Sequence, residues 1–233
     1  MYTSMWTAYP LYAATIGGSN TAGWKKNPSL DNDEQIDVTS SYAVNVGSTT
    51  SEGYNKDLLY YARGHHIPDA DRDNDASMHS QTYYWTNSTP QIHNGFNSGI
   101  WSSLEGAIRS QIPSGDTLYV VTGAAFNKVG ETKPITYITP QNQTKQCPVP
   151  NYYWKAVLKV KRSGATVTAA SAIGFWLEHR TYSTANNEHY YDYSVSIDEL
   201  ERYTGLDFFV NLPEEMQATA EDNSDWDRFC NLL

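Results

Sequence analysis

Apolar residues gather in short segments along this 233-residue chain, and polar stretches separate them. Four segments are rich in the aromatic and β-branched side chains that suit a pleated sheet, so we predict a strand over each. They are residues 5–12, 117–122, 152–160 and 169–177. By the same criterion, residues 58–62 and 82–86 predict two shorter strands.

Two segments show helical signals. From residue 97 to about 110, apolar residues fall on one helical face: Ile100, Trp101, Leu104 and Ile108. A second helix is predicted from the capping box Ser196–Glu199 to Gly205. Residues 17–56 are rich in Gly, Ser, Asn and Asp and predict long loops, and residues 69–79 predict a polar loop with a helical turn.

Strands and helices mix without a regular βαβ alternation, which indicates the α+β class: antiparallel sheets with flanking helices and long loops. No repeat or long linker divides the chain, so we expect one domain over residues 1–233. No apolar run approaches the ~20 residues of a membrane helix. No leader is visible at Met1, so either the chain is cytoplasmic or a leader has been removed.

Composition supports a folded core, because 39% of the residues are hydrophobic and 13% are aromatic. Cys147 and Cys230 show no spacing typical of a structural zinc site, and a disulfide between them stays open. The net charge of −10 argues against tight, processive binding to a polyanion. Residues 214–228 hold six acids against one arginine, so we expect an acidic C-terminal tail over about 213–233 that leaves a less acidic cleft elsewhere.

Polar groups stand at each junction of the strand, strand, helix order over residues 60–105. Hydrolysis of a phosphodiester needs a base for water, a cation, and a fixed positive group on the phosphate. His65 is the candidate base because imidazole titrates near neutrality. Gly64 removes bulk, so that the backbone can approach a polyanion. Arg63 can hold a phosphate with two parallel hydrogen bonds.

Asn97 is the candidate metal ligand, because Mg²⁺ keeps several waters and needs few protein ligands. Glu105 lies eight residues further along the predicted helix and suits contact with metal-bound water. Asn87 could orient His65 or a phosphate. Each also has a structural interpretation: Asn97 as a helix cap, Glu105 as a solvent-facing helix residue and Asn87 as a turn former.

Three motifs over residues 62–105 resemble those of the DNA/RNA non-specific endonuclease family, the ββα-metal or His-Me finger nucleases. They are Ala62-Arg63-Gly64-His65-His66-Ile67-Pro68 with Ala70-Asp71-Arg72, then Tyr83-Tyr84-Trp85-Thr86-Asn87-Ser88-Thr89-Pro90-Gln91, and then Asn97-Ser98-Gly99-Ile100-Trp101-Ser102-Ser103-Leu104-Glu105. Flanking segments extend the resemblance to roughly residues 4–212. It implies a ββα-metal active site.

By this resemblance, His65 is the general base and Asn97 the single protein ligand of Mg²⁺, for which Mn²⁺ is a substitute. Glu105 is a water-mediated metal contact, Arg63 stabilises the transition state and Asn87 supports the site. The implied substrates are DNA and RNA, cut to leave 5′-phosphates. The resemblance also favours export, to the periplasm, the cell surface or the medium. Whether the chain forms a homodimer stays open.

Two departures from the family pattern bear on rate and substrate preference. Ala62 stands where the family has an aspartate, and residues 21–23 lack an arginine that some members carry. Arg72 is the candidate to supply that positive charge to the substrate. The alternative function is a catalytically weakened, nucleic-acid-binding member of the same fold. An unrelated phosphoesterase or a carbohydrate-binding domain, suggested by the many aromatic residues, needs none of the three motifs.

Overall fold

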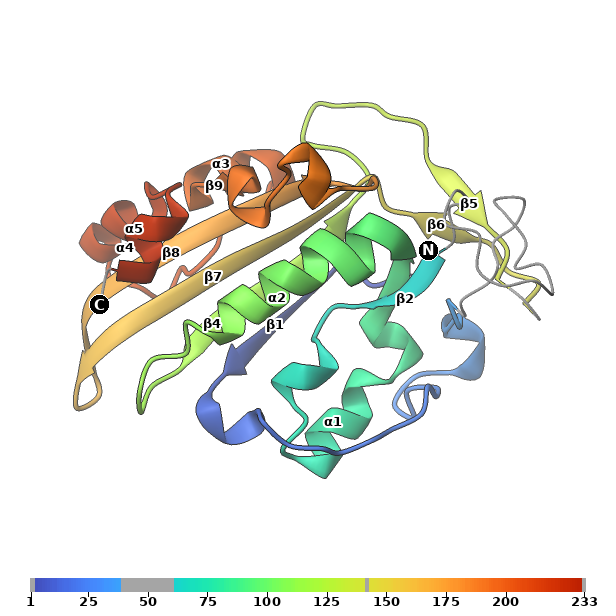
Figure 1. Cartoon of the computed structure of the whole chain (residues 1–233), viewed down its shortest axis with the longest axis horizontal. Helices are drawn as coiled ribbons and strands as arrows, with labels where there is room; N and C mark the ends of the chain where they lie inside the picture. Colours follow the sequence, from blue (N-terminus) through green and yellow to red (C-terminus); the bar gives the residue numbers. More distant parts are fainter. Residues whose placement is uncertain (1–2, 39–60, 141–142, 232–233) are drawn as a thin grey trace.

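A central five-stranded antiparallel sheet organises the computed structural model, which describes residues 3–38, 61–140 and 143–231. The strand order is β1-β4-β7-β8-β9, and Figure 1 shows the long strands β7 and β8 running side by side. Their bounds are β1 Trp6–Leu11, β4 Leu118–Ala125, β7 Tyr152–Ser163, β8 Thr166–Glu178 and β9 Ser194–Val195. The α+β class with antiparallel sheets is therefore confirmed, as are the predicted strands at residues 5–12, 117–122, 152–160 and 169–177.

Both faces of the central sheet are buried, and β7 shows how. Tyr153 and Val157 belong to the core cluster on the side of α2 (Ser102–Arg109). Trp154 and Leu158 belong to a second cluster on the side of α3 (Ile197–Thr204). A strand covered on both faces has few positions for polar side chains, which explains its nearly continuous apolar sequence. Lys155, fully buried in that run, lies between Tyr153 and Val157 on the α2 side.

The C-terminal part of the chain forms three helices. Helix α3 begins and ends as predicted: the Ser196 hydroxyl accepts a hydrogen bond from the Glu199 amide at 3.1 Å, and Gly205 ends the helix with φ 70°. Helices α4 (Glu214–Glu221) and α5 (Trp226–Asn231) contact β8. Figure 1 shows all three helices gathered at the β8 end of the sheet.

The expected acidic tail is wrong as a structural prediction. Its acidic residues lie on α4, on α5 and on the short connection between them, and the two helices bury three apolar side chains in the two cores: Ala220, Trp226 and Phe229. The reason is that these apolar residues are spaced so that one side of each short helix faces the sheet, while most of the charged residues, with the exception of the buried Glu221, face water.

A second, two-stranded antiparallel sheet carries the motif residues. Strand β2 (Tyr61–His65) pairs with β3 (Ser88–Ile92), and helix α2 follows β3. This is the expected ββα arrangement. Residues 58–60 of the predicted strand 58–62 lie outside the described residues, and the observed strand continues through the Arg-Gly-His motif.

The predicted strand over residues 82–86 is wrong. Helix α1 (Ala76–Thr82) ends there and a 3₁₀ turn follows at residues 85–87, so the partner strand of β2 is the next segment along the chain. Asp75 caps α1 by accepting a hydrogen bond from the Met78 amide at 2.8 Å. Tyr83 packs on the rings of Trp24 and His65 instead of a sheet face, and Tyr84 and Trp85 lie against lysines, so these contacts override the strand propensity of the segment.

The helix predicted over residues 97–110 is regular only over α2. Residues 93–101 form a wide, irregular helical turn, broken by non-helical backbone at Asn94, Gly95 and Gly99. Trp101 and Leu104 are core residues, as predicted.

A short hairpin of β5 (Thr136–Ile138) and β6 (Cys147–Val149) packs beside β3. Neither Cys147 nor Cys230 is part of a disulfide. In the part of the chain that the structure describes, no helix is both long and apolar enough to cross a membrane.

Candidate active site

His65, the last residue of β2, lies between two aromatic rings. The Trp24 ring centroid is 4.7 Å from that of the imidazole, and Tyr83 contacts it edge-on at 5.3 Å. Burial lowers the pKa of His65 from 6.5 to about 4, so the ring is neutral at pH 7. Its Nε2 atom is buried and has no hydrogen-bond partner among the residues that the structure describes. A buried ring nitrogen without a protein partner is free to accept a hydrogen bond or a proton from a substrate or a water molecule.

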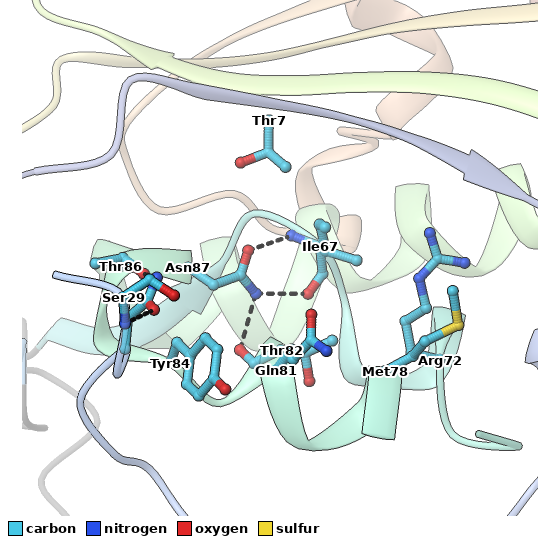
Figure 2. Close-up of a pocket in the computed structure, with 11 residues that line it drawn as sticks. Thr7, Ser29, Ile67, Arg72, Met78, Gln81, Thr82, Tyr84, Thr86 and Asn87 are labelled. Carbon is cyan, nitrogen blue, oxygen red and sulfur yellow. Dashed lines mark hydrogen bonds between the residues drawn. The ribbon is translucent and has the colours of Figure 1, made fainter. Parts of the chain in front are cut away.

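Asn87 holds the chain segment that follows His65. Its amide oxygen accepts from the Ile67 amide at 3.0 Å, and its amide nitrogen donates to the carbonyls of Ile67 and Thr82 at 2.9 and 2.8 Å. Figure 2 shows this side chain between the two backbone segments. The Asn87 carbonyl also accepts from the His66 amide at 2.9 Å. Because both polar atoms of its side chain already bind the backbone, Asn87 is placed to position His65.

Arg63 points to a carboxylate and an aromatic ring. Its guanidinium donates two hydrogen bonds to Asp37, at 2.8 and 2.9 Å, and lies 5.2 Å from the centre of the Trp24 ring. Trp24 therefore contacts both Arg63 and His65. The guanidinium is held in a defined place beside the candidate base, and the side chain keeps 21% of its surface exposed.

Gly64 connects the β2–β3 pair to Asn97. A Cβ at position 64 would lie 2.2 Å from Cδ of Gln91, a fully buried residue of β3. The Gln91 amide oxygen in turn accepts from the Asn97 amide nitrogen at 2.8 Å. Gly64 thus makes room for the side chain that orients Asn97, a role different from the close approach to a polyanion suggested by the sequence. No side-chain capping bond from Asn97 is found in this segment.

Glu105 is half-buried on α2 and lies in a network of charges with the buried Asp71 and Lys155. Burial raises the pKa of the Glu105 carboxyl, whereas Lys155, the strongest positive influence on it, acts in the opposite direction. Lys155 donates to the Thr122 hydroxyl at 3.0 Å and lies over the Trp101 ring. Its own pKa is lowered by burial. Because Lys155 belongs to β7, its interaction with Glu105 means that the Glu105 carboxylate lies on the side of α2 that faces the sheet, and not on the solvent-facing side.

Asp71 and Arg109 extend this network. The Arg109 guanidinium donates to Asp71 at 2.6 Å, and the Tyr9 hydroxyl donates to the other oxygen at 2.7 Å. Arg72 has a different environment: it is 5% exposed and donates to the Pro10 carbonyl at 2.7 Å. These contacts do not favour Arg72 as a direct substrate contact, since its guanidinium is already engaged with β1.

Asn87 also lines a cavity of about 430 Å³ (Figure 2). Ile67, Thr82 and Tyr84 are among its lining residues, together with Thr7 from β1. Its lining does not include His65, Asn97 or Glu105, so we assign no part of the reaction to this cavity.

Sequence reasoning missed several residues at this site: Trp24, Asp37, Tyr83, Arg109 and Lys155. Two of them left a signal. A lysine inside a strand buried on both faces needs a partner, and Arg109 lies four residues after Glu105, one helical turn away. Asp37 left none, because it reaches Arg63 from 26 residues away along the chain.

The donor set fits a hard divalent cation. Asn97 offers a neutral amide oxygen and Glu105 a carboxylate, and oxygen ligands are those that Mg²⁺ and Ca²⁺ prefer. The Gln91 contact occupies the nitrogen of the Asn97 amide and so directs its oxygen elsewhere. Neither of these two candidate ligands is a thiolate or an imidazole, which argues against a zinc-type site.

Comparisons with known proteins agree with this geometry. The family model described as DNA/RNA non-specific endonuclease matches residues 2–215. A nuclease of Serratia marcescens is 27% identical over 218 residues, which cover 93% of this chain and 72% of that protein. A nuclease of Nostoc sp. is 30% identical over 166 residues, 71% of this chain and 56% of the relative.

More distant relatives include mitochondrial proteins. Mitochondrial nuclease 1 of Schizosaccharomyces pombe is 26% identical over 66% of this chain and 48% of its own length. The chain thus spans about half the length of several relatives that it matches. A chain in the crystal structure of the EndoG/EndoGI complex shares the fold, with a TM-score of 0.68 and 19% identity over 91% of this chain and 80% of that chain. On the match over residues 2–215, this chain belongs to the DNA/RNA non-specific endonuclease family, a family of metal-dependent nucleases.

Proposed function

We propose that this protein is a metal-dependent endonuclease that hydrolyses phosphodiester bonds in both DNA and RNA. The observation that supports it best is the state of His65, a neutral, buried imidazole whose Nε2 has no protein partner in the described residues. His65 ends β2, and the neighbouring strand β3 carries Gln91, the residue that holds Asn97. A neutral imidazole with a free lone pair can accept a proton from water at pH 7.

In this proposal His65 takes the proton of the attacking water, and Asn87 keeps the following segment in place. Arg63 contacts a non-bridging phosphate oxygen with its planar guanidinium. Asn97 would hold Mg²⁺, and Glu105 would hold it through water. When bound, the cation supplies positive charge to the phosphate and to the leaving oxygen. The metal dependence follows from the family, and the choice of Mg²⁺, with Mn²⁺ as substitute, is part of the proposal.

Arg63 already donates two hydrogen bonds to Asp37. A substrate phosphate must therefore either bind Arg63 in addition to Asp37 or displace the Asp37 carboxylate. Either route leaves Arg63 as the better candidate than Arg72 for a direct phosphate contact, since Arg72 is nearly fully buried. A direct substrate contact by Asn87 would cost its bonds to Ile67 and Thr82, and this favours the positioning role.

The test is cleavage of supercoiled plasmid and of single-stranded RNA, with Mg²⁺ or with EDTA. We expect the wild type to degrade both polymers only with metal. His65→Ala should lower the rate by about 100-fold or more, because a positioned general base typically contributes 10²–10⁴. His189→Ala, at a half-buried imidazole far along the chain, is the matched control and should keep wild-type rates. Unchanged cleavage in His65→Ala, with an unchanged circular dichroism spectrum, would refute the assignment of His65 as the general base.

The second candidate is a catalytically weakened, nucleic-acid-binding member of the family. The net charge of −10 and Ala62 in place of the family aspartate favour it. It predicts that fluorescent DNA is bound at low salt and released as salt rises, with no cleavage in Mg²⁺ or Mn²⁺. Nicking that appears on addition of either metal decides against it.

We also propose that the protein acts outside the cytoplasm. Its relatives include bacterial nucleases and mitochondrial ones, so the family alone does not decide the compartment. Fractionation of the native host, with the protein detected by antibody, tests this: recovery in the cytosolic fraction alone contradicts it.

A further inference from the structure

Three carboxylates meet between helices α3 and α4, away from His65. Asp198 and Glu201 lie three residues apart on α3 and therefore share a face of that helix. Glu221 is the last residue of α4. Each contributes one carboxylate oxygen to a group in which all three oxygens lie within 4.8 Å of one another.

Glu221 is the unusual member. The residue is only 5% exposed, and its Oε1 atom is buried without a hydrogen-bond partner among the described residues. Burying a carboxylate oxygen with no partner costs free energy, so such an atom points to a ligand that the protein itself does not supply. Asp198, by contrast, is exposed, which leaves a path for water and ions to the cluster.

Among the described residues, the neutral amide of Gln217 forms a hydrogen bond with the Glu221 carboxyl, but no cation is among the groups that act on it most strongly. The charged groups that act on Glu221 most strongly are Glu201, Asp198 and Asp207, all of them acidic. Arg202, the cation next in sequence, donates to Glu199 at 2.9 Å instead. One oxygen of Glu201 accepts from the Phe208 amide at 2.6 Å, and this bond fixes the carboxylate in place. Fixed, like-charged oxygens this close together repel one another unless a cation lies between them.

We propose that Asp198, Glu201 and Glu221 bind a hard divalent cation of the calcium type. Ca²⁺ binds carboxylate oxygens at about 2.3–2.6 Å in flexible geometry, so oxygens up to about 5 Å apart can share one ion. Mg²⁺ requires about 2.0–2.1 Å and near-octahedral order, which three carboxylates spread over up to 4.8 Å fit less well. Water on the side of the exposed Asp198 completes the coordination.

This site is separate from the candidate active site. Ile197 and Leu200 of α3 and Ala220 of α4 pack in one core cluster, whereas Leu104 and Ile108 of α2 pack in the other, on the opposite face of the central sheet. Figure 1 shows α3 and α4 lying together over β8. A cation here joins the first turn of α3 to the end of α4. Its role is to stabilise the fold, and it takes no part in hydrolysis.

The test is thermal unfolding of chelator-treated protein, followed by circular dichroism, with 0 to 10 mM CaCl₂. A site with three protein ligands and a Kd of about 0.1–1 mM should raise the Tm by roughly 3–10 °C at 10 mM Ca²⁺. The same shift is expected in Asn97→Ala, which lacks the proposed catalytic metal ligand, and in Glu214→Gln, which removes an exposed acid from the other end of α4. Glu221→Gln should lose the shift and should melt higher than the wild type in chelator, because it removes a buried charge.

Three outcomes would overturn the proposal. The first is a wild-type Tm that does not respond to Ca²⁺. The second is an equal response in Glu221→Gln. The third is a Tm that rises on acidification in chelator with no response to Ca²⁺, which would show that the carboxylates share a proton instead. Calorimetric titration of Ca²⁺ into Asn97→Ala and into Asn97→Ala/Glu221→Gln gives the stoichiometry directly, and only the first should bind. None of these measurements depends on nuclease activity.

Discussion

The imidazole of His65 is kept neutral by its surroundings. Burial between Trp24 and Tyr83 is the main cause of its lowered pKa, of about 4, while nearby Asp69 acts in the opposite direction. A base works only in its unprotonated form, so this shift keeps His65 available well below pH 6.5. If His65 is the base proposed above, we expect these rings to extend its activity to lower pH, although neither carries a group that titrates near neutrality.

Trp24→Ala is expected to raise the pKa of His65 from about 4 toward 6.5, because removing the indole admits water to the ring. The measurement is an NMR pH titration of the His65 ring protons in metal-free protein. Trp6→Ala, at an exposed tryptophan of β1, should leave the titration unchanged. If His65 still titrates near pH 4 in Trp24→Ala, then another group causes the desolvation.

Asn87 contributes through three hydrogen bonds to backbone. Asn87→Ala leaves the Ile67 amide and two carbonyls without these partners in a buried setting, so we expect a loss of about 2–4 kcal/mol in the free energy of unfolding. Urea denaturation checks it. Asn74→Ala removes a single exposed bond to Ala14 and should cost less than about 1 kcal/mol. Equal losses in the two variants would mean that the Asn87 bonds have no special weight.

At the scale of secondary-structure elements, the pairing of β2 with β3 positions Asn97, the proposed metal ligand. Gln91 fills the space that Gly64 leaves open and then accepts the hydrogen bond of Asn97. The side chain at one strand position thus determines where a residue on the following helical turn lies. A one-residue slip in this register would move Gln91 to the other face of the sheet and release Asn97.

Gly64→Ala should therefore weaken metal binding without touching a ligand. Its Cβ would lie 2.2 Å from Cδ of Gln91 and displace that side chain. Loss of a residue that orients a ligand typically costs 10–100-fold in metal affinity, so we expect the Mg²⁺ concentration for half-maximal cleavage to rise by about that factor. Gly106→Ala adds a Cβ in open space on α2 and is the control. A normal Mg²⁺ requirement in Gly64→Ala would show that Gln91 does not orient Asn97.

Helix and strand prediction failed where tertiary contacts oppose local preference. Residues 82–86 have the composition of a strand, yet Tyr83 packs against His65, Trp24 and Asp69. The segment therefore ends a helix and turns. The helix around Asn97 was predicted correctly in place but not in regularity, since the backbone departs from helical geometry at Gly95 and Gly99. Gly95 has a positive φ and lies against Thr181 and Tyr182, so a contact distant in sequence accompanies the first of these breaks.

At the scale of the whole molecule, the negative charge is distributed unevenly. Residues 214–228, which include α4, hold six acids against one arginine and lie at the β8 end of the sheet, whereas the candidate active site is built from β2, β3 and α2 (Figure 1). The acidic segment is also part of the fold. Trp226 packs edge-on against Phe175 of β8 at 5.6 Å and against Tyr190 at 5.7 Å.

Truncation after Leu212 should therefore unfold the protein at a lower temperature, and it should not behave as removal of a disordered tail. Exposing the surfaces that Trp226 and Phe229 cover costs about 1.5–3 kcal/mol for each side chain, which corresponds to a Tm lower by roughly 10 °C. Differential scanning calorimetry measures it. The double variant Asp222→Asn/Asp227→Asn reduces the charge and keeps the helices, so it should melt near the wild type. A truncated protein as stable as the wild type would refute this packing role.

The sequence by itself determined the class of the fold, the main strands, the order of the motifs and the residues proposed for chemistry, because these depend on local composition and spacing. Only the tertiary structure decided what each motif residue contacts. Asp37 reaches Arg63 from 26 residues away, Trp24 covers His65, and Lys155 of β7 acts on Glu105 of α2, which packs on the same face of the sheet. Such pairs leave no periodic signal, since they form between segments that only the packing of two sheets and a helix brings together. The same packing joined α3 to α4 and so brought Asp198, Glu201 and Glu221 into one cluster.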